Sequence, residues 1–101
     1  MSITVHFRGP IAHIVLSGAV DYSLQDELQA ANKKVLAADN IREIHVDCEE
    51  VTFMDSSGIR ALFVLQKSAD EMGRSLILIN CNHTLRGIFE IGGFNKMFTI
   101  R

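Results

Sequence analysis

The segment from Phe53 to Leu62 limits the possible folds most, because a strand-like sequence passes directly into a helical one. Two apolar residues lead into the turn Asp55-Ser56-Ser57-Gly58, and an amphipathic stretch follows at once. Asp and Ser side chains accept hydrogen bonds from free N–H groups at a helix start, and Gly relaxes the local steric limits. The segment therefore predicts two hydroxyls at the positive end of a helix dipole, where a phosphate is stabilised. The plainer interpretation of the same residues is a helix cap with no binding role.

Strands and helices alternate along the rest of the chain. The short turn Arg8-Gly9-Pro10 between two apolar segments predicts an antiparallel hairpin at the start. The alternation after it predicts right-handed crossovers and mostly parallel pairing. The predicted fold is α/β: residues 1–101 form a single domain with a mixed sheet, the order β-β-α-β-α-β-α-β and helices packed on the sheet. The predicted strands are residues 3–7, 11–16, 41–48, 76–79 and 96–100, and the predicted helices run from Ser23 to about Asp39, from Ser57 to Met72, and from Asn82 or Thr84 to Gly92.

Polar residues and glycines predict where these elements end. The residues from Ser17 to Tyr22 are expected to break the second strand, and Ser23 to cap the first helix. Glu49-Glu50 is expected to form a solvated bend, after which residues 51–54 lead into the central turn. Gly73 is expected to end the second helix. Apolar spacing predicts the buried helix faces: Leu24, Leu28, Ala31, Val35 and Leu36 in the first helix, and Ile59, Leu62, Phe63, Val64, Leu65, Gln66, Ala69 and Met72 in the second.

Composition and charge exclude several classes of protein. Hydrophobic residues make up 48% of the 101 residues and charged residues 22%, which is typical of a folded chain. The net charge of -2 argues against nucleic acid as the main partner. The N-terminus does not have the layout of a signal peptide, and no apolar run reaches membrane-spanning length. Cys48 and Cys81 are not in a Cys-x-x-Cys motif. We therefore expect a cytoplasmic protein with two reduced thiols and no direct membrane insertion.

The sequence does not contain the residues that catalysis would need. His6, His13 and His45 lie inside predicted strands, and His83 lies in a loop. The Ser56-Ser57 turn is not the Gly-x-Ser-x-Gly elbow that exposes a nucleophilic serine. It also does not have the glycines and the Lys of a phosphate-binding loop, and no His, Cys and Asp cluster has metal-ligand spacing. No enzymatic activity, metal site or cofactor is therefore expected.

Three segments resemble the STAS domain family, and in particular the bacterial anti-sigma factor antagonists. The segment Phe53 to Ile59 is similar to the family's signature and is the most specific of the three. The segment Leu16 to Asp21 resembles the family's turn after the second strand, and Leu85 to Phe94 resembles the segment of the third helix. The predicted order of elements is also that of the family. The resemblance covers nearly the whole chain.

The resemblance implies a switch that acts through protein binding. In the family, an anti-sigma factor that is also a serine protein kinase binds the unphosphorylated antagonist and thereby releases the sigma factor. The kinase then phosphorylates the residue after the Asp of the signature, and this ends the interaction. A separate PP2C-type phosphatase removes the phosphate. By this resemblance the acceptor is Ser56, with Ser57 second, and Asp21 faces the same site. The implied partner interface consists of Asp21, Tyr22, Ser23, Asp55, Ser56, Ser57, Gly58, Ile59 and Arg60.

Two other functions stay open at this stage. The domain could be a STAS docking subunit of a transporter or of a larger signalling assembly, in which the same turn is a contact surface without phosphorylation. It could also be an enzyme or nucleotide hydrolase, which the arguments above disfavour. In the plainest case, Asp55 only caps the second helix.

Overall fold

An antiparallel hairpin begins the sheet and parallel strands continue it. The computed structural model describes residues 2–101. Its strands are β1 (Ser2–Arg8), β2 (Ile11–Val20), β3 (Glu43–Met54), β4 (Ser75–Ile79) and β5 (Thr99–Ile100), its α-helices are α1 (Gln25–Ala37), α2 (Ser56–Glu71) and α3 (His83–Gly92), and its short 3-10 helices are η1 (Tyr22–Leu24) and η2 (Phe94–Lys96). The strand order is β1-β2-β3-β4-β5, with β1 antiparallel to β2 and the other neighbours parallel.

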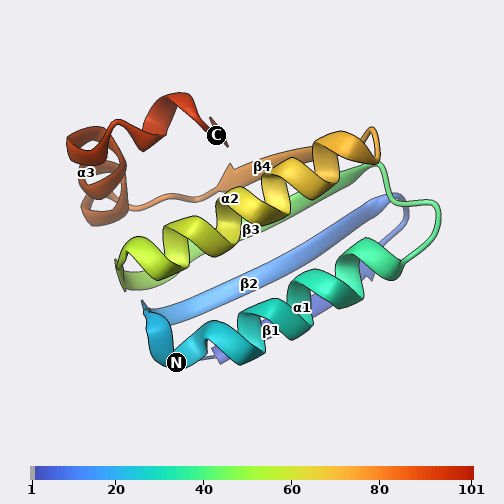
Figure 1. The fold of residues 1–101 in the computed structure, drawn as a ribbon, viewed down its shortest axis with the longest axis horizontal. Coiled ribbons are helices and arrows are strands. Elements are labelled where there is room, and N and C mark those ends of the chain that lie inside the picture. Colours follow the sequence, from blue (N-terminus) through green and yellow to red (C-terminus); the bar gives the residue numbers. More distant parts are fainter. Residues whose placement is uncertain (1) are drawn as a thin grey trace.

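The helices α1 and α2 lie side by side over one face of this sheet (Figure 1). Alternate strand residues point toward them and are fully buried: Ile14 and Leu16 in β2, Ile44 and Val46 in β3, and Leu78 in β4. Each such side chain stabilises the fold by roughly 1.5–3 kcal/mol relative to an exposed position. The helix α3 packs beside the second half of β3, past the end of β4 (Figure 1). The predicted single α/β domain with helices packed on a mixed sheet is confirmed.

The prediction of where β2 and β3 end was wrong. β2 does not break at Ser17 but continues to Val20, and β3 has no bend at Glu49-Glu50 but runs from Glu43 to Met54. Irregularities in the register near Ser17 and Gly18 let the two strands stay paired. A β-bulge, in which one strand has an extra residue, changes the local twist and lets the pairing continue beyond it. Polar residues and a glycine therefore do not have to end a strand. As a result, both strands reach the turn at Asp55.

Several helix boundaries also differ from prediction. Asp21, not Ser23, is the first capping residue: it caps η1, and α1 begins after it at Gln25. The α-helix α1 ends at Ala37, before Asp39. Asn82 rather than Thr84 caps α3, which settles that alternative. The last strand contains only residues 99 and 100, because a 3-10 turn takes up Lys96.

The buried face of α2 is narrower than predicted. Phe63, Val64 and Met72 were expected to pack inside, but they are 40%, 54% and 48% exposed. Only the stripe that faces the sheet is buried, because no second layer covers the outer side of α2 in the described chain. The buried residues of α2 are Gly58, Ile59, Leu62, Leu65 and Ala69.

A row of three histidines crosses the opposite face of the sheet. His6, His13 and His45 are direct neighbours in β1, β2 and β3. The rings of His6 and His13 stack with 4.7 Å between centroids, and His13 meets His45 edge to face at 5.3 Å. Burial, followed by repulsion from His6 and His45, lowers the pKa of His13. No three His, Cys, Asp or Glu residues among positions 2–101 are grouped to hold a metal.

The helices within residues 2–101 are all too short or too polar to cross a lipid bilayer.

Asn82 should be the residue that anchors α3 to the sheet. Its Oδ1 accepts from the N–H of Leu85 at 2.9 Å, and its Nδ2 donates to the carbonyl of Val51 at 2.6 Å. Asn82→Ala removes both bonds and should lower the free energy of unfolding by about 2 kcal/mol. Thr84→Ala, an exposed position in the same turn, should change it by less than about 0.5 kcal/mol. Urea denaturation checks both values, and equal stability of the two variants would show that Asn82 is not the anchor.

Candidate functional site

The candidate site forms where β2 and β3 end next to each other. Val20 and Met54, the last residues of the two strands, are paired neighbours in the sheet. Each is followed by an aspartate, Asp21 or Asp55. The N–H of Asp55 donates to the carbonyl of Val20 at 3.2 Å and holds the two turns against each other. The parallel pairing therefore brings together two acidic turns that are far apart in the sequence.

The two turns have the same local structure. In each, one carboxylate oxygen accepts hydrogen bonds from both the N–H and the hydroxyl of the serine two residues later: Asp21 from Ser23, and Asp55 from Ser57. Asp55 also accepts from the N–H of Gly58 at 3.1 Å. Such a cap stabilises a helix start by about 1 kcal/mol. The helix cap predicted at Asp55 is thus confirmed, and the matching cap at Asp21 was not predicted from the sequence.

The two serines of the turn have different surroundings. Ser56 is the first residue of α2 and is exposed. Ser57 is half-buried, and its hydroxyl donates to Asp55 at 2.6 Å. Modification of Ser57 would break this bond, whereas modification of Ser56 would leave the cap intact. Of the two predicted acceptors, Ser56 therefore has the more accessible hydroxyl.

Asp55 is held in its charged form. The hydroxyl of Ser57 lowers the pKa of the Asp55 carboxyl most, partial burial opposes this, and the N–H groups of Gly58, Ser57 and Tyr22 lower it further. The start of α2 therefore has a fixed negative charge, which already accepts hydrogen bonds from the N–H groups of Ser57 and Gly58.

Most of the predicted interface residues reach the surface, but two do not. Tyr22 is 72% exposed, and Arg60 is exposed one turn into α2. Ile59, only 6% exposed, is part of the core, and Gly58 is buried. These two residues shape the turn and do not offer side-chain surface to a partner. Phe53, which is 49% exposed beside the turn, was not among the predicted interface residues.

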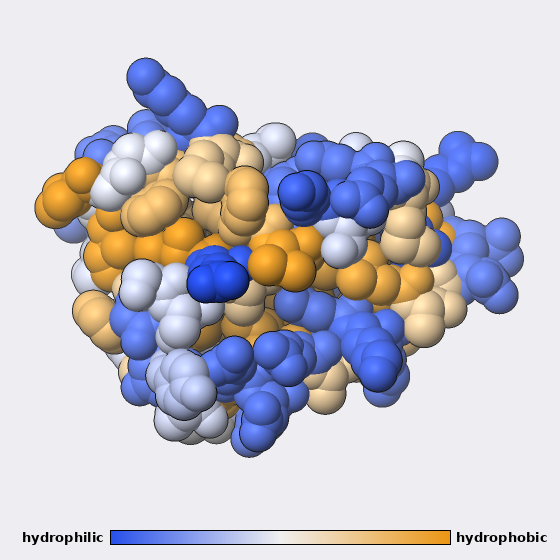
Figure 2. Space-filling view, in the orientation of Figure 1, coloured by the Kyte–Doolittle hydropathy of each residue, from blue (hydrophilic) through white to orange (hydrophobic). Residues whose placement is uncertain are grey.

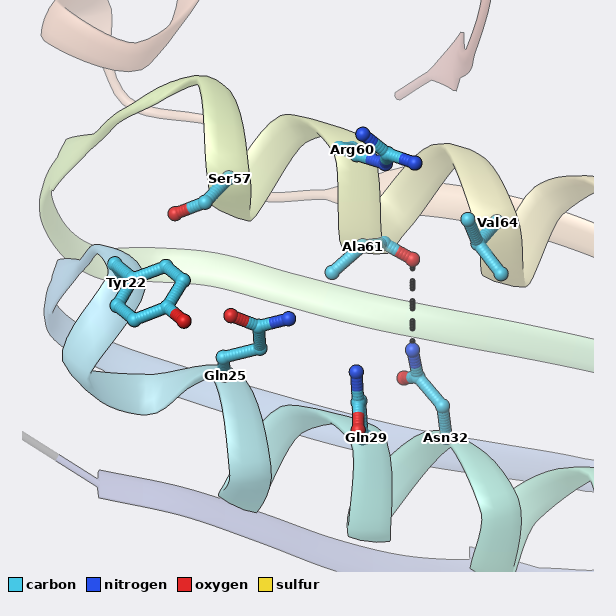
Figure 3. A pocket seen from close by; sticks show the side chains of 8 residues that line it. All are labelled: Tyr22, Gln25, Gln29, Asn32, Ser57, Arg60, Ala61 and Val64. Carbon is cyan, nitrogen blue, oxygen red and sulfur yellow. Dashed lines mark hydrogen bonds between the residues drawn. The ribbon is translucent and has the colours of Figure 1, made fainter.

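A cleft between α1 and α2 opens beside this turn and was not predicted from the sequence. Its volume is about 530 Å³. Figure 3 shows side chains from both helices pointing into it. Three amides on α1 occur at helical spacing, which was the signal available in the sequence. The lining residues are Tyr22, Gln25, Gln29 and Asn32 on one side, and Ser57, Arg60, Ala61 and Val64 on the other.

Residues 2–101 match the family model described as the STAS domain. The chain belongs to the STAS domain family. A STAS-domain containing protein of Pseudomonas aeruginosa strain UCBPP-PA14 is 29% identical to this STAS domain over 87 residues, which are 86% of this chain and 84% of that protein. The human sulfate anion transporter 1 is 33% identical over 60 residues, which are 59% of this chain but 9% of the transporter.

Solved structures of the anti-sigma factor antagonist SpoIIAA have the same fold as this STAS domain. The unphosphorylated form superposes with a TM-score of 0.76 at 20% identity. The aligned region includes 99% of this chain and 87% of the SpoIIAA chain. The phosphorylated form of the Bacillus protein superposes with a TM-score of 0.75 at 20% identity, and the aligned region includes 99% of this chain and 91% of the SpoIIAA chain. At this identity the likeness shows the fold alone. This STAS domain is thus equally similar to the two forms.

Gly58 should be required for the close contact between α2 and the end of β2. A Cβ atom there would lie 2.8 Å from the carbonyl oxygen of Val20 and 2.8 Å from Cγ of Met54. Gly58→Ala should therefore lower the free energy of unfolding by about 1–3 kcal/mol. Gly87→Ala in α3, where nothing lies within 4 Å, should raise it by about 0.5–1 kcal/mol. Thermal denaturation of the two variants measures both changes in the free energy of unfolding, and an unchanged stability of Gly58→Ala would contradict the contact.

The cap at Asp55 should make stability depend on pH in the acid range. Because the folded pKa of Asp55 lies below its ordinary value of 3.8, ionised Asp55 stabilises the fold above that value, and the contribution is lost as the pH falls through the folded pKa. Asp55→Asn keeps a capping oxygen without the charge. Wild type should therefore be more stable than Asp55→Asn at about pH 6, and the difference should shrink toward zero near about pH 2.

Urea denaturation across this pH range measures the difference. The exposed Asp39 lies in the turn after α1, so Asp39→Asn controls for the change in net charge. A difference between wild type and Asp55→Asn that does not vary with pH would contradict the proposed role of the charge.

Proposed function

We propose that this STAS domain is an anti-sigma factor antagonist that acts as a phosphorylation-controlled switch in the cytoplasm. The unphosphorylated form binds an anti-sigma factor that is also a serine protein kinase. Phosphorylation of Ser56 releases that partner, and a PP2C-type phosphatase restores the binding form. Residues 1–101 act as a single binding unit without catalytic residues, metal or cofactor of their own.

The observation that carries this proposal is the position of Ser56. Ser56 is exposed as the first residue of α2, whereas the side chains of the neighbouring Asp55 and Ser57 are hydrogen-bonded to each other. A kinase can therefore reach and modify the Ser56 hydroxyl without disturbing the cap. The membership of the STAS domain family and the fold shared with SpoIIAA support the same function.

A phosphate on Ser56 changes the charge of the surface more than it changes the fold. It adds about -1.5 to -2 charge at pH 7. The positive end of a helix tolerates that charge, so α2 should keep its structure. Asp55 and Asp21 are close by, and an unpaired dianion buried at an interface costs several kcal/mol. Release of the partner therefore follows from charge and bulk at the contact, with little change in the domain itself.

The surface around Ser56 has the composition of a protein contact. Tyr22 and Phe53 are exposed aromatic residues on the two turns, and Val64 is exposed further along α2. Figure 2 shows an apolar band across the middle of this face, with polar side chains on either side. Exposed aromatic residues surrounded by polar ones are typical of binding hot spots.

Substitutions at Ser56 test the proposal. The anti-sigma kinase should phosphorylate wild type and Ser57→Ala, which keeps the acceptor, but not Ser56→Ala. Ser56→Ala should bind the kinase at least about tenfold more tightly than Ser56→Asp, because the added carboxylate faces the contact unpaired. Mass spectrometry and calorimetric titration give the two readouts. Equal affinity of Ser56→Ala and Ser56→Asp would contradict the switch.

A docking subunit of a transporter or signalling assembly is the second candidate. The similarity to a short part of the human sulfate anion transporter 1 favours it. In that case the same surface binds its partner permanently, and ATP with a candidate kinase leaves the mass of the domain unchanged. Addition of one phosphate, located at Ser56, decides for the switch.

A further inference from the structure

Arg60 has no charged partner among residues 2–101. The exposed Arg60 is the only charged residue among those that line the cleft between α1 and α2. Within residues 2–101, the single ion pair closer than 4.0 Å joins His45 to Glu43 on the opposite face of the sheet. The guanidinium of Arg60 is therefore available to an anion from outside.

The floor of the cleft contains an unused hydrogen-bond acceptor. Asn32 is 92% buried, since only 8% of its surface is exposed. Its Nδ2 donates to the carbonyl of Ala61 at 3.4 Å, while its Oδ1 has no partner among the described residues. Figure 3 shows this oxygen on the same side of Asn32 as Gln29, within the cleft. An unpaired buried acceptor costs roughly 1–3 kcal/mol, so a donor that enters the cleft would bind favourably.

Ser56 and Arg60 are four residues apart on α2. Side chains at this spacing lie on the same face of a helix, about 5–6 Å apart at Cβ, and oppositely charged pairs there attract each other. Both residues are exposed, so their side chains are free to meet. Arg60 can therefore reach a phosphate on Ser56 as well as the cleft.

A phosphate on Ser56 would find few other partners at the helix start. The N–H groups of Ser57 and Gly58 already donate to the Asp55 side chain, and the N–H of Ile59 donates to the Asp55 carbonyl. The nearby carboxylates of Asp55 and Asp21 repel it. The nearest free cation on the same helix face is Arg60.

We propose that Arg60 couples the modification to docking. In the unphosphorylated domain, a segment of the anti-sigma kinase docks in the cleft between α1 and α2, where its acidic side chain pairs with Arg60 and a separate donor group of the same segment faces Asn32 Oδ1. In the phosphorylated domain, Arg60 pairs with the phosphate of Ser56 and the cleft loses its only cation. The contact between Arg60 and the kinase, the docking half of this inference, rests on the proposed function. The pairing of Arg60 with the phosphate, the phosphate half, does not.

The phosphate half is tested without a kinase, with phosphoserine incorporated at position 56 during translation. Titration followed by phosphorus NMR gives the second pKa of the phosphate in three proteins: wild type, Arg60→Gln and Lys67→Gln. Lys67 is an exposed cation of the same helix, seven residues beyond Arg60, and serves as the matched control. Arg60→Gln should raise that pKa by about 0.3 units or more, and Lys67→Gln should leave it unchanged. Equal values for wild type and Arg60→Gln would overturn the pairing.

The docking half is tested with the kinase that phosphorylates Ser56. Arg60→Gln should weaken its binding to the unphosphorylated domain about two- to fivefold, and the loss should shrink at high salt. Lys67→Gln should bind like wild type. Unchanged affinity of Arg60→Gln would overturn this half. If no kinase modifies Ser56, the docking half fails together with the proposed function, while the NMR titration still decides the pairing.

Discussion

The parallel pairing of β2 with β3 as far as Val20 and Met54 is the constraint on which the functional end of the molecule depends. It places Asp21 and Asp55 on neighbouring turns, and the bond from the Asp55 N–H to the Val20 carbonyl fixes their separation. The same carbonyl lies so close to Gly58 that a side chain at this position would clash, so the first turn of α2 packs against β2 only with a glycine there. The start of α2, and with it Ser56, is therefore positioned by the sheet.

Different residues of the turn stabilise the fold and offer a hydroxyl at the surface. The Asp55 carboxylate accepts hydrogen bonds from the hydroxyl of Ser57 and from two backbone N–H groups, and these bonds form the cap. Ser56, between them in the sequence, is left exposed. A modification can therefore alter the surface without removing an interaction that stabilises the domain, since the buried stripe of α2 lies on its other side. This arrangement suits a switch that is read by a partner and not by a change in fold.

The sequence was sufficient to predict the fold class, the hairpin, the order of elements and the cap at Asp55, because each depends on local residue patterns. It was not sufficient for features that depend on neighbouring elements. β2 continues through Gly18 because β3 pairs beside it, and Phe63 is exposed because no other element of residues 2–101 covers the outer side of α2. The cleft between α1 and α2 combines residues from two crossovers, so no single segment reveals it.

Arg60 is the point at which these local and long-range features meet. Helical spacing places it on the same face as Ser56, and the packing of α1 beside α2 makes it the only cation of the cleft. The cap at Asp55 occupies the N–H groups of Ser57 and Gly58, two of the backbone donors that an anion at this helix start would otherwise use. The turn therefore tolerates an anion at the helix start but offers it few free donors, and the counter-charge for a phosphate there comes from a side chain. One guanidinium must then serve either the phosphate or the cleft, which links the two by competition and requires no movement of the sheet.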